Sequence, residues 1–371
     1  MTEYKLRELL EIKNGKDYKH LSEGEIPVYG SGGLMTYVDE SLYQGESILL
    51  PRKGSLSNIQ YVNEQFWTVD TIYYSVIDTS KTEPYYLYRY LTLLDLKHLN
   101  SGTGVPSMTF GAYYDIPIKL PNLNIQKQIA KVLSDLDAKI EVNNKINQEL
   151  ESMAKTLYDY WFVQFDFPDE NGKPYKSSGG KMVYNEELKR EIPEGWEVGI
   201  IENLLAKEQL GGKTLSSEYL DSGNIPIIDQ SIKFICGYTN DESKRIKAKV
   251  PRIVFGDHTR ILKLINFDFA RGADGTQILL SKEERVPQHF FYHSLLKIDL
   301  SNYGYARHFK FLKDTKTIIP YLDVVENYEE KAKTWFEMIW TNLKQNQKLS
   351  ELRDWLLPML MNGQVSVKEA S

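Results

Sequence analysis

The sequence repeats itself at an offset of 199 residues, and this duplication constrains the possible folds more than any other feature. Three separated pairs of segments match at that offset: "GEIPVYG" (24–30) with "GNIPIID" (223–229), "IKLP" (118–121) with "TIIP" (317–320), and "INQELESMAKTLYDYW" (146–161) with "QNQKLSELRDWLLPML" (345–360). One shared offset across three segments indicates two copies of one architecture. Two copies are too few for a solenoid of short repeats.

Each copy begins with a mixed region that combines short strands with one short helix. The predicted strands, rich in Ile, Val, Tyr and Thr between Gly, Pro and Ser, are "SILLPRKG", "IQYV" and "TIYYSV" in the first copy and "IPIID", "RIVFGD" and "TQILL" in the second. "PYYLYRYLTLLDL" and "PQHFFYHSLLKI" predict one amphipathic helix per copy, each with a proline near its start.

A long helix is predicted to follow each mixed region. The first runs from about Ile125 to Phe162 and the second from about Val325 to Asn362, both with apolar residues at spacings of three and four. A helix of about 37 residues spans roughly 55 Å, which is too long for its apolar stripe to be covered by one small domain. We expect the two helices to pack on each other as an antiparallel pair. The alternatives are that each packs on its own domain or on another subunit.

Individual residues refine this prediction. Asn143 and Asn147 fall on the apolar seam of the first long helix, where buried Asn fixes the register of a coiled coil at some loss of stability. Pro358 is expected to disturb the last turn of the second helix, and Gly363 to end it.

These elements predict an α+β fold, with two pseudo-symmetric mixed α/β domains held apart by two long antiparallel helices that form a coiled coil. The predicted segments are 1–124 for the first mixed domain, 125–163 for the central helix, 164–190 for a connector, 191–324 for the second mixed domain, 325–363 for the C-terminal helix and 364–371 for a tail.

Composition and charge narrow the class of protein. The chain is 42% hydrophobic and 26% charged, with a single cysteine, Cys236, and without an apolar run long enough to cross a membrane. Its N-terminus lacks the apolar core of a signal peptide, so we expect a cytoplasmic protein without membrane contact. The formal net charge of -6 argues against a non-specific coat on nucleic acid, although local basic loops remain compatible with it.

Catalytic and metal-binding motifs are not evident. "LGGKT" (210–214) resembles the end of a phosphate-binding loop, but Lys207 stands where that motif requires its first glycine. One cysteine and six scattered histidines give no zinc-ligand spacing, so no metal site is predicted. Asp257 and His258 could form a catalytic dyad. This is the weakest reading, because neighbouring residues on an extended segment tend to point apart.

Six loops rich in hydrogen-bonding groups occupy corresponding places in the two copies. They are "PRKGSLSN" (51–58), "WTVDT" (67–71) and "NSGTGVPSMTFG" (100–111) in the first, and "FGDHTR" (255–260), "RGADGT" (271–276) and "YGYARHFKF" (303–311) in the second. Arg, Asn, Gln, Ser, Thr and His can bond to base edges, and Lys and backbone amides suit phosphates. The alternative is that the Asp and Gly residues serve only as turn residues.

We therefore expect these loops to contact DNA. The candidate residues are Arg52, Lys53, Ser55, Ser57, Asn58, Asp70, Thr71, Thr103, Ser107, Gln230, His258, Thr259, Arg260, Asp274, Arg307, His308 and Lys310. Gly256 is expected to turn the chain at a strand end so that His258, Thr259 and Arg260 face the DNA. Asp257 is expected to brace the turn or to accept a hydrogen bond from a cytosine amino group.

Over essentially its whole length the chain resembles the specificity (S) subunits of type I restriction-modification enzymes. The resemblance rests on the order of eight segments: "IPVYGSGGL", "ILLPRKGS", "GTGVPSMTFGAYYDIPIKLP", "QKQIAKVLSDLDAKIEVNNKINQELESMAKTLYDYWFVQFDFP", "KPYKSSGGKMVYNEELKREIPEGWEV", "IVFGDHTR", "GADG" and "GYARHFKFLKD". None is a short universal motif, but their arrangement in duplicated recognition and helical regions is specific.

The resemblance implies a division of labour. Residues 1–124 and 191–324 would be target-recognition domains that each read half of a split site in double-stranded DNA. The helices would set the gap between the halves. Two modification (methyltransferase) subunits would dock on the chain, and restriction subunits would translocate and cut. The family is non-catalytic, so no cofactor is expected here. S-adenosylmethionine, ATP and Mg²⁺ would bind to the partner subunits.

Two other functions remain open at this point. The chain could serve a partner in which methyltransferase and nuclease are fused in one polypeptide. It could also be a two-headed protein-binding adaptor with a coiled-coil spine, in which case replacement of Arg260 and Arg307 by Ala would leave DNA affinity unchanged.

Overall fold

The computed structural model describes residues 1–54, 56–96, 99, 106–208, 210–272, 275–304 and 307–367 of the chain. Its contacts divide it into two compact units. Unit 1 comprises residues 1–142 and 345–371, and unit 2 comprises residues 143–344. The predicted central and C-terminal helices each belong partly to both units, so the units do not coincide with the predicted segments.

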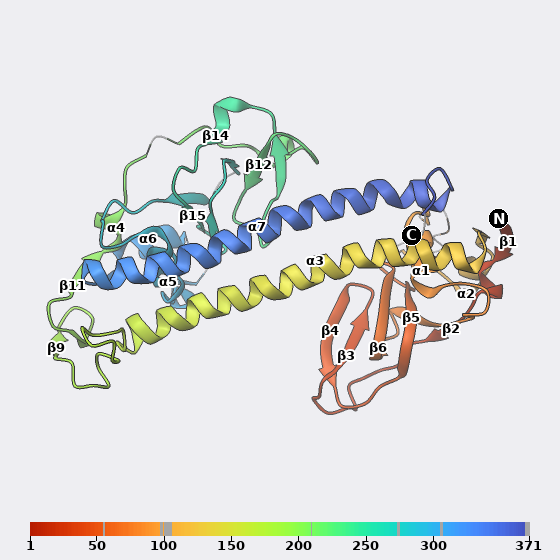
Figure 1. Cartoon of the computed structure of the whole chain (residues 1–371), viewed down its shortest axis with the longest axis horizontal. Coiled ribbons are helices and arrows are strands. Elements are labelled where there is room, and N and C mark those ends of the chain that lie inside the picture. The colour runs from red at the N-terminus through yellow and green to blue at the C-terminus, as the bar shows by residue number, and fades with distance from the viewer. Residues whose placement is uncertain are drawn as a thin grey trace. The chain divides into compact units, whose positions relative to one another are not determined.

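Unit 1 is built around a mixed sheet with the strand order β2-β7-β5-β6-β3-β4, beside the antiparallel pair β1-β8 (Figure 1). The strands are β1 (Thr2–Lys5), β2 (Leu10–Asn14), β3 (Ile26–Gly30), β4 (Gly33–Val38), β5 (Tyr43–Pro51), β6 (Gln60–Thr68), β7 (Ile72–Ile77) and β8 (Pro117–Leu120). The short helices are α1 (Pro84–Thr92) and α2 (Phe110–Tyr114). Glu83 accepts a hydrogen bond from the Tyr86 amide and caps α1, whose first residue is Pro84.

Unit 2 contains the sheets β13-β12-β17-β14 and β16-β15-β18 and the pairs β9-β10 and β11-β19. The strands are β9 (Met182–Asn185), β10 (Arg190–Pro193), β11 (Glu197–Ile200), β12 (Ile225–Ile228), β13 (Gly237–Thr239), β14 (Arg245–Ile246), β15 (Arg252–Gly256), β16 (Leu262–Ile265), β17 (Phe269–Arg271), β18 (Thr276–Leu279) and β19 (Lys316–Ile319). The short helices are α4 (Ile201–Leu204), α5 (Gln288–Leu296) and α6 (His308–Asp314).

Strand pairing confirms the duplication. β3 pairs with β4 antiparallel and with β6 parallel, and β12 pairs with β13 antiparallel and with β17 parallel. The antiparallel pair β5-β7 corresponds to β15-β18, and β1-β8 corresponds to β11-β19. All six quoted strand runs and both quoted short helices are found where the sequence predicts them.

The two long helices are α3 (Leu123–Tyr158) and α7 (Leu322–Met361), and a π-helical turn, Asp159–Val163, follows α3. Within each unit they lie side by side (Figure 1). In unit 1, Arg353 Nη1 donates to Asp137 Oδ1 at 2.7 Å. In unit 2, Tyr328 Oη donates to the Ala154 carbonyl at 3.4 Å. Residue numbers rise on one helix as they fall on the other, which confirms the predicted antiparallel pairing.

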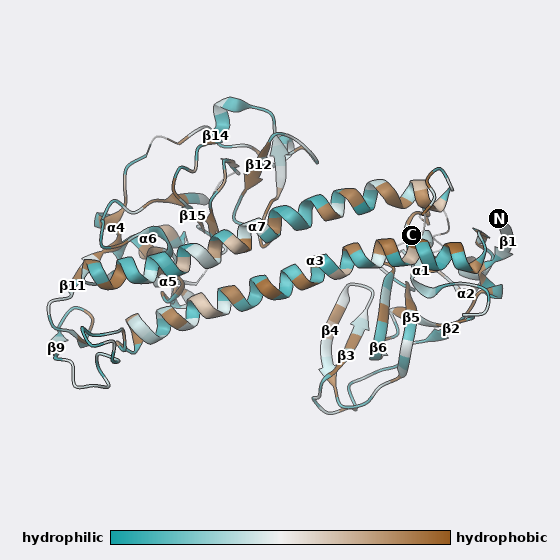
Figure 2. Ribbon diagram, in the orientation of Figure 1, coloured by the Kyte–Doolittle hydropathy of each residue, from teal (hydrophilic) through white to brown (hydrophobic). Residues whose placement is uncertain are grey.

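Each pair of helix segments closes the core of its own unit. In unit 1, Leu133 and Leu357 join a buried core with Tyr86 and Ile118. In unit 2, the corresponding core is aromatic: the rings of Phe162 and Phe290 are 4.7 Å apart. Figure 2 shows apolar and polar residues alternating along both helices, as expected for helices that bury one stripe.

The end of α7 lies close to the predicted Asn362. Pro358 lies inside the helix, which continues for three more residues to Met361. The amide of Asn362 still donates to the Pro358 carbonyl at 3.1 Å. Gly363 then adopts a positive φ of 76° and ends the helix, as predicted.

Neither a membrane-spanning helix nor a cluster of metal ligands is found among the described residues. No helix there is both long and apolar enough to span a membrane. Nor does that part of the chain bring three His, Cys, Asp or Glu side chains together as metal ligands.

The polar layer in the helix pair of unit 2 leads to a stability prediction. Asn342 Nδ2 donates to the buried Asn147 Oδ1 at 2.9 Å. Asn342→Ala removes that donor, so we expect a loss of about 1–3 kcal/mol in urea unfolding. The double replacement of Asn147 and Asn342 by Leu should be at least as stable as the wild type, because it removes both polar groups together. A double variant as weak as the single one would contradict this account.

A buried histidine leads to a pH prediction. His293 lies in the aromatic core of unit 2, with its Nδ1 2.8 Å from the Tyr328 hydroxyl. Burial lowers the pKa of His293 to about 4, because the charged imidazolium is poorly solvated there.

Between pH 6.5 and about 4 the unfolded chain therefore binds a proton that the folded chain does not, and folding stability falls as the pH falls. The contribution of His293 is at most about 3 kcal/mol. Denaturant unfolding at pH 7 and pH 4.5 should show a smaller acid-induced loss for His293→Phe than for the wild type. Equal losses would show that His293 does not carry this dependence.

Candidate nucleic-acid interface

The three predicted loops of unit 1 meet through their backbones. Directly after β5, the Arg52 amide donates to the Thr71 carbonyl at 2.9 Å, and the Arg52 carbonyl accepts from the Met108 amide at 2.9 Å. Lys53 and Ser107 form an isolated β-bridge. We call the two backbone hydrogen bonds of Arg52, one to the Thr71 carbonyl and one from the Met108 amide, the clasp of unit 1. It joins the ends of "PRKGSLSN", "WTVDT" and "NSGTGVPSMTFG" into one surface.

Side chains from the clasp face solvent to different degrees. Lys53, Ser57 and Asp70 are exposed. Arg52 is half-buried, with its Nη1 3.4 Å from the Asp70 carbonyl and its guanidinium 5.9 Å from the Tyr73 ring centre. The remaining described candidates of this unit, Asn58, Thr71 and Ser107, are also half-buried.

Unit 2 has the same clasp at Asp257, which follows β15. The Asp257 amide donates to the Gly275 carbonyl at 2.7 Å, and the Asp257 carbonyl accepts from the His308 amide at 2.8 Å. Residues 52 and 257 thus make equivalent backbone bonds in the two copies, although Arg occupies one position and Asp the other. The two copies therefore share the backbone hydrogen bonds that hold the loops, which we call the backbone frame. The side chains on this frame differ between the copies.

Among the described residues of its loops, the exposed candidate side chains of this second surface are basic or neutral. His258, Thr259 and Arg260 are exposed on the turn after β15, as the sequence predicts, and Arg307 and Lys310 are exposed at α6. Arg260 adopts a positive φ of 62°, which is uncommon for a residue other than Gly, and its amide donates to the Gly256 carbonyl at 2.7 Å.

Two candidates in unit 2, His308 and Gln230, hold the backbone of the loops together with Asp257 and do not face solvent. His308 is buried, and its Nδ1 and Nε2 lie 2.9 and 3.2 Å from the carbonyl oxygens of Asp257 and Gly304. Asp257 is buried and its Oδ1 accepts from the Phe309 amide at 2.8 Å, so it braces the turn. Gln230 is half-buried, and its Oε1 accepts from the His258 amide at 3.1 Å.

Three of the predicted contact residues, Ser55, Thr103 and Asp274, lie outside the described residues.

The structure adds Ser31 to the surface of unit 1. Its carbonyl accepts from Asn58 Nδ2 at 2.7 Å, and its amide lies 3.4 Å from Thr71 Oγ1. Gln230 plays the same part in unit 2, where its carbonyl accepts from Thr259 Oγ1 at 2.7 Å. Ser31 and Gln230 are separated by the repeat offset, so the repeat alone could have identified Ser31 once Gln230 was chosen.

Cys236 lies near this surface but is a poor candidate for redox chemistry. Its thiol donates to Asp229 Oδ1 at 2.7 Å. Burial and the neighbouring Asp229 carboxylate raise the pKa of the Cys236 thiol, so less of the reactive thiolate is present at neutral pH.

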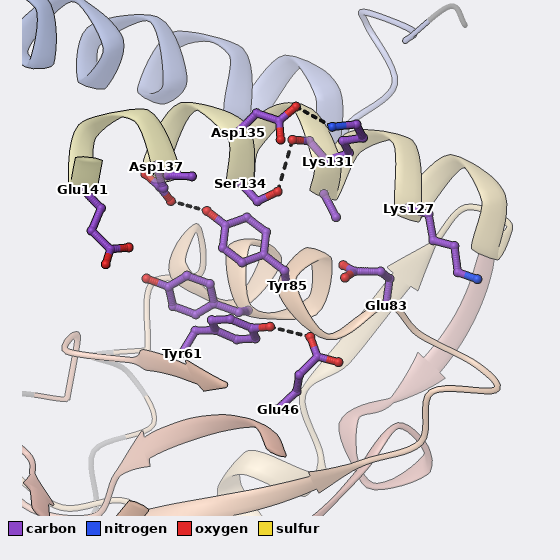
Figure 3. Close-up of a pocket in the computed structure, with 13 residues that line it drawn as sticks. Glu46, Tyr61, Glu83, Tyr85, Lys127, Lys131, Ser134, Asp135, Asp137 and Glu141 are labelled. Atoms are coloured by element: carbon purple, nitrogen blue, oxygen red, sulfur yellow. Dashed lines mark hydrogen bonds and ion pairs between the residues drawn. The ribbon is translucent and has the colours of Figure 1, made fainter. Parts of the chain in front are cut away.

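A hollow of about 640 Å³ between α1 and α3 of unit 1 is lined by more acidic than basic side chains, unlike the loops (Figure 3). Five carboxylates and two lysines are among its lining residues: Glu46, Glu83, Asp135, Asp137, Glu141, Lys127 and Lys131. Burial and the nearby Glu46 raise the pKa of Glu83. Asp137 bonds to Tyr85, Arg89 and Arg353. This charge disfavours phosphate, so we place the candidate interface at the loops and not at the hollow.

Comparisons with known proteins show which proteins the chain resembles. A family model described as the type I restriction modification DNA specificity domain matches residues 1–152. The MjaIX specificity subunit of a type I restriction enzyme from Methanocaldococcus jannaschii is 28% identical over 309 residues, which cover 77% of this chain and 69% of that protein. The HindI specificity subunit from Haemophilus influenzae is 23% identical, and the match covers 71% of this chain and 72% of that protein.

A solved structure shares the fold. The crystal structure of a type I restriction-modification S subunit from M. genitalium matches with a TM-score of 0.60 at 16% sequence identity, covering 100% of this chain and 96% of that one.

The close packing around Gly256, at the end of β15, leads to a stability prediction. A Cβ atom there would lie 2.1 Å from Thr259 Oγ1 and 2.8 Å from Gln230 Cβ. We expect Gly256→Ala to lower the free energy of unfolding by roughly 1–3 kcal/mol, because the turn must open to admit the methyl group. Gly212→Ala is the control, since nothing lies within 4 Å of its added Cβ. If both variants unfold at the same urea concentration as the wild type, the close packing at Gly256 is not limiting.

Proposed function

The chain belongs to the specificity subunits of type I restriction-modification enzymes, and from this premise we propose that each of its two units reads one half of a bipartite DNA site. As a specificity subunit it is the non-catalytic DNA-recognition component of the system. The observation that carries the proposal is the duplicated clasp at Arg52 and Asp257, which presents different side chains on equivalent backbone frames.

The exposed side chains suit this role. Arg260 and Arg307 can donate two hydrogen bonds to a guanine edge, and Thr259 and His258 can bond more flexibly. Lys53 and Lys310 suit phosphate oxygens. These groups give each surface local positive charge within a chain whose formal net charge is -6. We infer that partner subunits supply much of the remaining phosphate contact.

In each unit the long helices expose apolar side chains that suit docking of those partners. They include Val142, Leu352 and Trp355 in unit 1, and Ile146 and Met153 in unit 2. Apolar side chains that a helix pair leaves uncovered mark an interaction surface. We propose that two modification subunits dock there and that the helix pair sets the gap between the half-sites.

Catalysis and cofactors would belong to the partners. Modification subunits would bind S-adenosylmethionine and turn the target adenine out of the duplex, and restriction subunits would use ATP and Mg²⁺. A partner that fuses methyltransferase and nuclease would use the same reading surfaces. The loops with their basic side chains favour DNA over a second protein as the target of both units.

The proposal predicts a defined methylation pattern. The chain combined with its modification subunits should methylate adenines in one bipartite sequence, because two separate surfaces read it. Methylation mapping by long-read sequencing of treated DNA tests this. Methylation at a single continuous site would contradict the two-reader model.

Exchange of the second mixed region provides the control. When residues 191–320 are replaced by the corresponding segment of another specificity subunit, one half-site should change while the other half-site and the gap stay the same. A change in both half-sites would show that the units do not read independently.

A further inference from the structure

Asp257 is the residue at which three segments of the second surface converge. It is 5% exposed. Its amide donates to Gly275, its carbonyl accepts from the His308 amide, and its Oδ1 accepts from the Phe309 amide at 2.8 Å. The first two bonds belong to the clasp, which Arg52 also makes in unit 1. The carboxylate bond is an addition that the first copy lacks, because the Arg52 side chain has no acceptor.

The added bond links two groups of exposed side chains. His258, Thr259 and Arg260 directly follow Asp257. On the other side of the bond, Arg307 is the N-cap residue of α6 and Lys310 lies in its first turn, next to Phe309. A charged acceptor makes a stronger hydrogen bond than a neutral one, and it is favoured beside the first amides of a helix. The carboxylate therefore ties the turn after β15 to α6.

We propose that Asp257 is a positioning residue for base recognition: the base preference of the second half-site depends on it although its side chain does not touch DNA. This inference rests on the proposed function. Its physical basis is that recognition groups discriminate between bases only when their donors are held within about half an ångström of the right geometry. Without the carboxylate bond, the turn and α6 can shift against each other, and donors on both can then meet the wrong base.

Burial separates this role from a direct contact. The Asp257 side chain is covered, and one of its oxygens is already bonded to a backbone amide. A cytosine amino group could reach the carboxylate only if the groups that cover it moved aside.

The test compares Asp257→Ala with Asp257→Asn in the complete complex with the modification subunits. The readout is the ratio of methylation rates on the correct site and on sites with one altered base in either half. Asp257→Ala should lower discrimination in the second half-site about tenfold, which corresponds to the effect of one good base contact. Asp257→Asn should retain it within about twofold, because its amide oxygen can still accept from Phe309.

Other outcomes overturn the inference. The inference is wrong if Asp257→Ala discriminates between bases as well as the wild type does. It is also wrong if the methylation rate of Asp257→Ala falls equally on every sequence, because a merely structural role would give that result. If the alanine variant does not fold, Asp257→Ser replaces it, since its hydroxyl is one atom too short to reach the Phe309 amide. The serine variant should show the same relaxed preference, and wild-type discrimination in it would equally overturn the inference.

The first copy provides the matched control. Arg52→Ala changes the equivalent position of unit 1 and should relax only the first half-site, while Asp257→Ala should leave that half-site within about twofold of the wild type. Failure of the proposed function is distinguishable from failure of this inference. If the proposed function is wrong, the wild-type complex shows no bipartite methylation. If only this inference is wrong, the wild-type complex methylates a bipartite site and the Asp257 variants discriminate between bases as well as the wild type does.

Discussion

Burial of the apolar stripes of α3 and α7 is the constraint on which the rest of the structure depends. Neither helix can cover its stripe alone, and in each unit a segment of both closes the core beneath a sheet-containing region. Leu133 and Leu357 do so in unit 1, and Tyr158 and Tyr328 in unit 2. The hydrophobic effect thus couples the two ends of the sequence, because residues near the C-terminus complete the core formed by the N-terminal strands.

The duplicated frame explains how one architecture can serve two recognition surfaces. Backbone bonds at Arg52 and Asp257 hold the loops in both copies, and they depend little on which side chain is present. Side chains at the surface are then free to differ without loss of the fold. Arg52 is partly exposed in one copy, whereas Asp257 is withdrawn in the other and its neighbours His258 and Arg260 take the exposed positions.

Charge is distributed unevenly over the molecule. Exposed Lys and Arg side chains lie at the loops, while the hollow between α1 and α3 is rich in carboxylates. A chain with net negative charge can still bind DNA if its cations are concentrated where the phosphates approach. The carboxylates of the hollow disfavour phosphate there, which is consistent with the proposed placement of the interface at the loops.

The sequence by itself determined the duplication, one strand run at each of six places, one short helix per copy and the antiparallel pairing of α3 and α7, because periodicity and the repeat offset record which faces are buried. It also identified loops at strand ends, which Gly, Asp and Thr mark. The predicted loop 303–311 was wrong from His308 on, because His308–Asp314 form α6. The roles of single loop residues were decided by the tertiary structure. His308 and Arg307 are neighbours with similar chemistry, yet His308 is buried against the Asp257 carbonyl while Arg307 is exposed. The roles of His308 and Arg307 differ because the fold brings His308 against Asp257, about 50 residues away along the chain. Burial and hydrogen bonding depend on what lies nearby in space, which the sequence around these two residues does not show.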